Sequence, residues 1–226
     1  MSLNQILAIS ESVGINDQRF IGQMLSRNQR LSTSEVLTVV PFKFTLQPMN
    51  YLLYSQNRGL LNSLRIPDKA LEQYLNFGAT GWKHYIEYQG DLTNAQVQAA
   101  KWQTSSANKV LVLGDLPAIS SSSYIVRVGD FCQVGRYSYI ATADVQRGGA
   151  STVNIPVHRN LIQTLSSPVD AVLGEFGITT SLGGDNYFGI TFPVVLQDYP
   201  TYRLIPMTND SFIQWSGNFV AFENVL

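Results

Sequence analysis

Short apolar runs separated by turn residues fill the central part of the chain, from Tyr124 to His158. Glycine next to a polar residue is a strong local signal for a tight turn between two strands. Three such signals interrupt the segment: Gly129-Asp130, Gly135-Arg136 and Arg147-Gly148-Gly149. The pattern predicts successive β-strands, including one over 137–145 and one over 152–155 that ends at Pro156.

Two helical stretches are expected in the first third of the chain. Ser2 with Gln5 three positions later is typical of a capping box, and apolar residues follow at near-helical spacing as far as Gly14. Leucines supply one apolar side over 50–77, and Pro67-Asp68 is typical of a helix start within that range. The sequence therefore predicts a short N-terminal helix and a helical insertion over 50–77.

Alternation of apolar and polar residues predicts strands elsewhere. Phe42, Phe44 and Leu46 alternate with polar residues, which predicts a strand with one buried face within 36–46. Over 92–103, Thr93 with Gln96 suits a helix cap, yet the alternation there suits a strand equally, and we favour the strand. Further strands are expected over 82–88, 109–113, 170–176, 178–182, 187–196, 202–206 and 212–225, with a hairpin turn at 183–186.

These elements together predict a mainly β fold, a sandwich or a partly closed barrel. The N-terminal helix and the helical insertion over 50–77 are its expected helical parts. We expect residues 1–34 to form the N-terminal helix and an arm, and residues 35–226 to form a β-rich domain that contains the insertion.

The segment 15–34 carries arginines spaced among apolar residues. One interpretation is a helix and loop on the surface of the same domain. The other is an arm that packs on a neighbouring subunit, with arginine side chains as anchors. The candidate subunit-interface residues are Arg19, Phe20, Met24, Arg27 and Arg30. The sequence leaves both interpretations open.

Charged residues make up 14% of the chain, against a typical value of about 25%, while hydrophobic residues make up 45%. A surface with few charges is often covered by another subunit, which favours extensive subunit contacts over a monomer with a polar, uncharged surface. The net charge of −1 argues against direct, sequence-specific nucleic-acid binding. No apolar stretch is long enough for a transmembrane helix, and no N-terminal leader is expected.

The residues that most often carry chemistry do not form a recognisable site. His84 and His158 lie in different expected strands without ligands at metal spacing, and no phosphate-binding or dinucleotide-binding loop is present. Asp130 and Asp144 could be considered as the paired carboxylates of a glycosidase, but their strand and turn contexts favour a role as turn formers. The single Cys132 is expected in the core. We therefore expect no enzyme activity, no cofactor and no metal.

The strand and turn pattern from Tyr124 to Arg159 resembles a β-module of structural proteins in long-tailed bacteriophages, found at the tail tip, hub and baseplate. The resemblance extends loosely to the C-terminus, where Trp215-Ser-Gly-Asn-Phe-Val-Ala-Phe-Glu is similar to a closing strand of such proteins. It implies a structural virion protein of the distal tail, hub or baseplate, made in the host cytoplasm. Its expected partners are further copies of itself, in a ring that is hexameric rather than trimeric, and other tail or baseplate proteins.

Two alternatives stay open at this point. The first is a tail-tip module that binds carbohydrate or a receptor, for which some of the 11 tyrosines, 11 phenylalanines and 3 tryptophans would have to be exposed. The second is a cell-wall-degrading tail enzyme. Most aromatic residues fall on the apolar side of the expected strands, which favours a core role and hence the structural interpretation.

Overall fold

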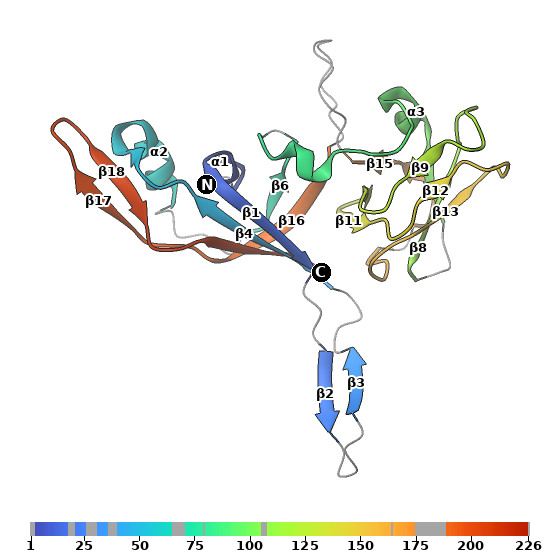
Figure 1. Ribbon diagram of the computed structural model, residues 1–226, viewed down its shortest axis with the longest axis horizontal. Helices are drawn as coiled ribbons and strands as arrows, with labels where there is room; N and C mark the ends of the chain where they lie inside the picture. Colours follow the sequence, from blue (N-terminus) through green and yellow to red (C-terminus); the bar gives the residue numbers. More distant parts are fainter. Residues whose placement is uncertain are drawn as a thin grey trace. The chain divides into compact units, whose positions relative to one another are not determined.

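The computed structural model describes residues 3–17, 21–25, 31–35, 40–64, 71–78, 80–104, 108–163, 165–174 and 189–225 (Figure 1). The fold is mainly β, with a curled half-barrel sheet and few helices, which confirms the predicted fold class. The chain divides into two compact units. Unit 1 comprises Met1–Leu75 and Pro193–Leu226, and unit 2 comprises Asn76–Phe192. The predicted division into 1–34 and 35–226 stays a prediction.

A five-stranded sheet forms most of the framework of unit 1. Its strands, in spatial order, are β1 (Ser10–Asp17), β4 (Phe42–Pro48), β19 (Phe219–Glu223), β16 (Thr191–Asp198) and β6 (Gln73–Asn76). The predicted alternation in β4 is confirmed, because Phe42, Phe44 and Leu46 are all fully buried. Phe44 lies opposite Ala221 and Leu46 opposite Phe219, so that buried side chains meet across the two central strands.

The N-terminal helix α1 (Leu3–Ala8) contacts β1 and β4 and buries Leu3, Ile6 and Leu7. A short helix at the N-terminus is therefore confirmed, although the chain continues into β1 directly after Ile9. The proposed cap at Ser2 lies outside the described residues. Gly14, expected to stop the helix, lies within β1 opposite Thr45.

A smaller sheet of unit 1 has the order β17 (Tyr202–Pro206), β18 (Ser211–Trp215) and β5 (Leu52–Leu53). Helix α2 (Tyr54–Leu64) follows β5 and contacts both β18 and β5. The predicted helical insertion is thus confirmed in its first half. Its second half is wrong where the chain is described, because 73–76 form β6; there Leu75 is buried and Tyr74 is 49% exposed, an alternation that suits a strand.

Unit 2 is built from short strands arranged in three small sheets. Their spatial orders are β11-β10-β15, β12-β9 and β13-β8-β7-β14. The elements are η1 (Lys83–Ile86), α3 (Asn94–Ala99), β7 (Lys101–Gln103), β8 (Val110–Gly114), β9 (Tyr124–Val126), β10 (Phe131–Val134), β11 (Tyr137–Ile140), β12 (Val145–Gln146), β13 (Val153–Pro156), β14 (Val169–Asp170) and β15 (Val172–Leu173).

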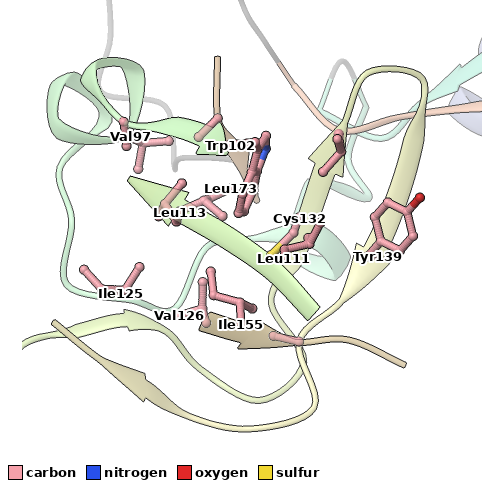
Figure 2. Packing of buried hydrophobic residues seen from close by; sticks show 14 of the residues in the cluster. Val97, Trp102, Leu111, Leu113, Ile125, Val126, Cys132, Tyr139, Ile155 and Leu173 are labelled. Atoms are coloured by element: carbon pink, nitrogen blue, oxygen red, sulfur yellow. The ribbon is translucent and has the colours of Figure 1, made fainter. Parts of the chain in front are cut away.

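One hydrophobic core joins these sheets (Figure 2). Trp102 lies fully buried within it, and its indole N–H donates a hydrogen bond to the Gln133 carbonyl oxygen at 2.7 Å, which links β7 to β10. Cys132 is also fully buried, as expected for a small apolar core residue, and burial raises the pKa of its thiol. Small sheets that share one core do not need a large continuous sheet for stability.

The strands predicted for 124–158 are largely confirmed, and the predicted turn glycines explain their boundaries. Gly129, Gly135 and Gly148 all have positive φ, a conformation that glycine adopts at little cost. The strand expected over 137–145 is divided into β11 and β12, however. The carboxylate of Asp144 accepts a hydrogen bond from Val128 N at 2.8 Å, so the chain turns where an unbroken strand was expected.

Two expected strands of unit 2 are helical instead. Residues 83–86 form the 3₁₀ turn η1 within the strand predicted over 82–88. In the segment over 92–103, Thr93 and Gln96 form a reciprocal capping box that begins α3, and only 101–103 form a strand. The hydrogen bonds of the capping box stabilise a helix here, so the strand that we favoured is wrong for residues 94–99.

In the last third of the chain, β17 and the pair β18 and β19 confirm the strands expected over 202–206 and 212–225. The strand expected over 170–176 is divided into β14 and β15. The strand expected over 178–182 and the hairpin turn at 183–186 lie outside the described residues.

Candidate assembly surface

The predicted interface segment 15–34 is β-structured where its backbone is described. Strand β2 (Ile21–Leu25) pairs antiparallel with β3 (Leu31–Glu35), and β1 already extends through Asp17. The helix-and-loop interpretation is therefore wrong for these residues. The β-branched and small residues of β2 and β3, including Gly22 and Thr33, favour a hairpin over a helix.

Most of the predicted interface residues lie outside the part that the structure describes. Met24 lies in β2, where its backbone faces Ser32 of β3. The others lie outside the described residues: Arg19, Phe20, Arg27 and Arg30. A role for these side chains in a subunit interface stays a prediction.

Exposed apolar side chains instead gather at the small sheet β17-β18-β5. They lie in its strands or within a few residues of them in the sequence. Their exposed fractions are 42% for Met49, 61% for Tyr51, 38% for Tyr199, 43% for Leu204 and 44% for Met207. Large apolar side chains that are grouped and half exposed are typical of a surface that another molecule covers.

Along one row across this sheet, the residue on the outer strand β17 is the most exposed. Ile213 of the middle strand lies opposite Leu52 on one side and Leu204 on the other. Ile213 is fully buried, whereas Leu204 at the outer strand is 43% exposed. One further strand placed beside β17 would cover Leu204 in the way that the sheet covers Ile213.

The hydrogen-bonding register shows which backbone groups of β17 face outward. Ser216 N donates to Thr201 O at 2.9 Å, and Met207 N donates to Asp210 O at 2.8 Å. Since hydrogen-bonded and non-hydrogen-bonded pairs alternate along an antiparallel ladder, the N–H and C=O groups of Tyr202 and Leu204 point away from β18. In the described part of the chain, β17 pairs with β18 alone.

Little protects this edge from pairing with another chain. Lysines, bulges and inward-pointing charges usually blunt an exposed edge strand. The one charged residue of β17 is Arg203, whose side chain bonds Gln214 of the neighbouring strand at 2.6 Å. Pro206 at the end of the strand lacks one outward donor, whereas Leu204 keeps its outward N–H and C=O groups.

The turn after β17 is attached to helix α2. Asp210 accepts hydrogen bonds from the Ser55 hydroxyl at 2.6 Å, from Ser55 N at 3.2 Å and from Ser211 N at 2.7 Å. These bonds, that of the Ser55 hydroxyl above all, lower the pKa of the Asp210 carboxyl. A negative charge at the first turn of α2 also suits the helix dipole, so the hairpin is held in one orientation on its helix.

A second fixed point lies beside β5. Tyr51 has a positive φ of 64°, its N–H donates to Ile213 O at 2.8 Å, and its ring packs edge-on against Phe212 with centroids 6.0 Å apart. Asn50 accepts a hydrogen bond from Trp215 N at 2.9 Å. The exposed Tyr51 ring is therefore held in a defined position, which lowers the entropic cost of covering it.

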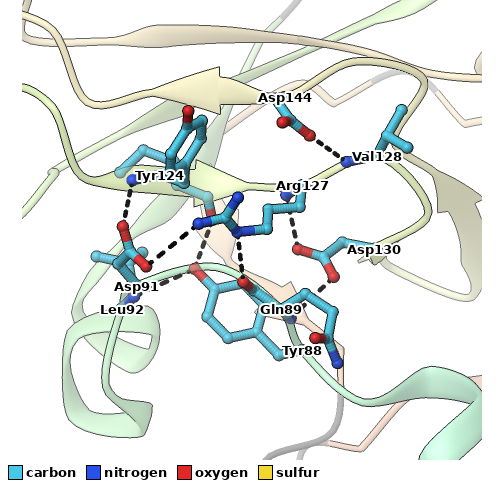
Figure 3. A network of polar contacts seen from close by, with 10 residues as sticks. Tyr88, Gln89, Asp91, Leu92, Tyr124, Arg127, Val128, Asp130 and Asp144 are labelled. Atoms are coloured by element: carbon cyan, nitrogen blue, oxygen red, sulfur yellow. Dashed lines mark hydrogen bonds and ion pairs between the residues drawn. The ribbon is translucent and has the colours of Figure 1, made fainter.

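In unit 2, the two aspartates considered for chemistry organise turns (Figure 3). Asp130 accepts hydrogen bonds from Gln89 N at 2.9 Å and from Arg127 N at 2.8 Å. Asp130 is 1% exposed, and its burial raises the pKa of its carboxyl. The interpretation of Asp130 and Asp144 as turn formers is confirmed, because each accepts backbone N–H groups.

Arg127 connects this turn to the neighbouring loop. Its guanidinium lies 4.0 Å from the centre of the Tyr124 ring, its Nε donates to Gln89 O at 3.0 Å, and its Nη2 lies 3.9 Å from Asp91 Oδ1 (Figure 3). Tyr88 beneath it donates its hydroxyl to Ile125 O, and its burial raises the pKa of that hydroxyl. The network holds loops of unit 2 together.

The two histidines make separate local contacts with the backbone. His84 lies in η1, and its Nδ1 is 3.2 Å from Gly81 O. His158 follows β13, and its Nδ1 accepts a hydrogen bond from Ile140 N at 3.0 Å. Among the described residues, no group of three or more His, Cys, Asp or Glu side chains is arranged to hold a metal ion. The expected absence of a cofactor and of enzyme activity stays a prediction.

The sequence of β17 contains a weak signal for an exposed edge. The run Tyr202–Pro206 has apolar residues on both faces, a pattern that is unusual for a strand with one face exposed to solvent.

In the described ranges, no helix is long and apolar enough to span a bilayer. Comparison of the chain with protein-family models and with curated proteins yields no match.

Proposed function

We propose that the chain is a structural protein of a phage tail that assembles by adding strands to strands, forming a ring of the distal tail, hub or baseplate around the channel. The observation that carries this proposal is the β17 edge. Leu204 directs its backbone N–H and C=O away from β18, and its side chain is 43% exposed. A strand from a second copy would bind these two backbone groups and cover that side chain.

Two features of unit 1 and one of the whole chain support assembly over a monomeric role. The exposed apolar side chains are held by the sheet, by Asp210 at α2 and by the Tyr51 backbone. The sheet carries one charged residue on its outer strand. The chain as a whole has 14% charged residues, few with which to keep a sheet edge apart from its neighbours.

The place in a phage tail rests on the resemblance of the strand and turn pattern over 124–159 to a β-module of tail structural proteins. A head-to-tail contact between identical chains either closes into a ring or grows without limit, and a ring around the channel requires that it closes. We propose six copies in preference to three, with neighbouring tail and baseplate proteins as the other partners.

Replacing Leu204 by proline tests the edge most sharply. The Leu204 N–H points away from β18, so proline removes a group that no other strand in the described part of the chain pairs with, and it leaves the ladder to β18 intact. We expect Leu204→Pro to keep the circular dichroism spectrum of the original protein and to abolish its assembly. Cross-linking mass spectrometry at increasing protein concentration measures the loss of links between β17 of one copy and a different strand of the next copy.

Leu204→Ala is the matched control. It shortens the same side chain but keeps the outward N–H, so it should still assemble, with an affinity lowered by about 1–2 kcal/mol from the lost apolar burial. Full assembly of a folded Leu204→Pro protein would show that the β17 edge is not used. Equal loss in both variants would assign the effect to the side chain and contradict strand addition.

A further inference from the structure

Three aromatic rings cluster on the short turn η1 of unit 2. The ring centroids are 6.0 Å apart for Trp82 and Tyr85, 6.0 Å for Trp82 and His84, and 5.0 Å for His84 and Tyr85. Because side chains three positions apart lie above one another on a 3₁₀ helix, Trp82 and Tyr85 share one side of the turn. Tyr85 is 44% exposed, His84 is exposed and Trp82 is partly exposed.

The backbone around these rings is fixed by local hydrogen bonds. Trp82 N donates to the Thr80 hydroxyl at 3.2 Å, and that hydroxyl donates to Phe77 O at 2.9 Å. Tyr85 N donates to Trp82 O at 3.0 Å, which closes the turn. The next alternate residues, Ile86 and Tyr88, are buried and anchor the turn to the core. The rings are thus positioned before any ligand arrives.

The composition of this patch distinguishes it from the β17 edge. Around the β17 edge the exposed apolar residues include Leu204 and Met207, whereas on η1 they are rings with polar edges. Residues with hydrogen-bonding side chains lie next to the rings in the sequence, namely Lys83, Glu87 and Gln89, of which the last two are exposed. A flat apolar face beside several donors and acceptors fits a ligand that itself has an apolar face and a rim of hydroxyl groups.

We propose that Trp82 and Tyr85 form a carbohydrate-binding site, whose ligand is an oligosaccharide of equatorially linked pyranose units. Such a sugar ring presents a face of axial C–H groups that can stack on an aromatic face, while its hydroxyls reach the polar side chains around it. The planes of Trp82 and Tyr85 are tilted by 54°, so one flat ligand cannot stack on both. Two successive sugar rings, rotated relative to each other, can each stack on one of the two aromatic rings.

Saturation-transfer NMR on the full chain tests this site with named probes. Chitohexaose and cellohexaose have equatorial linkages, and maltohexaose, with an axial bond in each linkage, is the matched probe. We expect transfer to the axial ring protons of the first two and little to maltohexaose. Trp82→Ala should abolish the saturation transfer. Tyr85→Ala should raise the dissociation constant about threefold to tenfold, because one stacked ring is lost.

Tyr74→Ala is the control, since Tyr74 is 49% exposed but belongs to β6 in unit 1. It should bind like the original protein. Trp82→Phe keeps an aromatic face and should retain part of the binding, which separates loss of stacking from loss of folding. Absence of transfer from both equatorially linked probes would overturn the proposal, as would undiminished transfer in Trp82→Ala or a preference for maltohexaose.

Discussion

Trp102→Ala is expected to lower the free energy of unfolding of unit 2 by about 3–5 kcal/mol, a large share of the stability of an ordinary domain. Trp102 is fully buried within the core that joins the small sheets (Figure 2). Its removal leaves a cavity that the short surrounding strands cannot close, and it leaves the Gln133 carbonyl oxygen without its indole donor.

Trp102→Phe separates these two causes. Phenylalanine keeps an aromatic ring in the core but cannot donate to Gln133 O, so its cost should be smaller, about 1–3 kcal/mol. Urea unfolding followed by circular dichroism, with hydrogen exchange of β7 and β10 to assign the change to unit 2, measures both. A loss below 1 kcal/mol for Trp102→Ala would contradict the placement of this residue at the centre of the core.

The second large effect is expected for Gly174→Ala, with a loss of about 2–4 kcal/mol. Gly174 has a φ of 53°, where a side chain is strained. An added Cβ would also lie 2.8 Å from the Cα and N atoms of Tyr88, and these backbone atoms belong to a residue that is itself buried. Both strain and overpacking therefore act at this position.

Gly148→Ala controls for the strain alone. Gly148 has a nearly equal φ of 57°, but nothing lies within 4 Å of a Cβ added there. We expect a loss of about 1–2 kcal/mol for this variant, from the left-handed backbone only. Thermal unfolding of both variants gives the comparison. Equal losses at the two positions would mean that Gly174 and Tyr88 are not in close contact.

Sequence patterns predicted the fold best where burial alone decides the structure. In β4 every second residue is buried, so the alternation of Phe42, Phe44 and Leu46 was sufficient. The pattern failed over 82–88, where Ile86 and Tyr88 are buried but the turn between Trp82 and Tyr85 places both rings on one side. Alternation and a 3₁₀ turn can bury the same residues, and periodicity alone does not separate them.

The two candidate surfaces were harder to predict because each depends on contacts between distant parts of the chain. The outward direction of the Leu204 backbone follows from the register with β18, and its exposure follows from the position of β17 at the end of a sheet. Neither the direction of this backbone nor its exposure can be inferred from residues 202–206 alone. Asp130 was easier to interpret, because an aspartate after glycine acts through neighbouring backbone groups.

We propose that copies of this chain form a ring in a phage tail through the β17 edge. Cryo-electron microscopy of an assembled tail containing this chain tests this ring most directly, since copy number, symmetry and strand contacts appear together. We expect six-fold density for the chain, with a strand of the adjacent copy beside Tyr202–Pro206. Three-fold density would revise the ring to a hub. Single copies projecting outward, with β17 in contact with solvent, would contradict it.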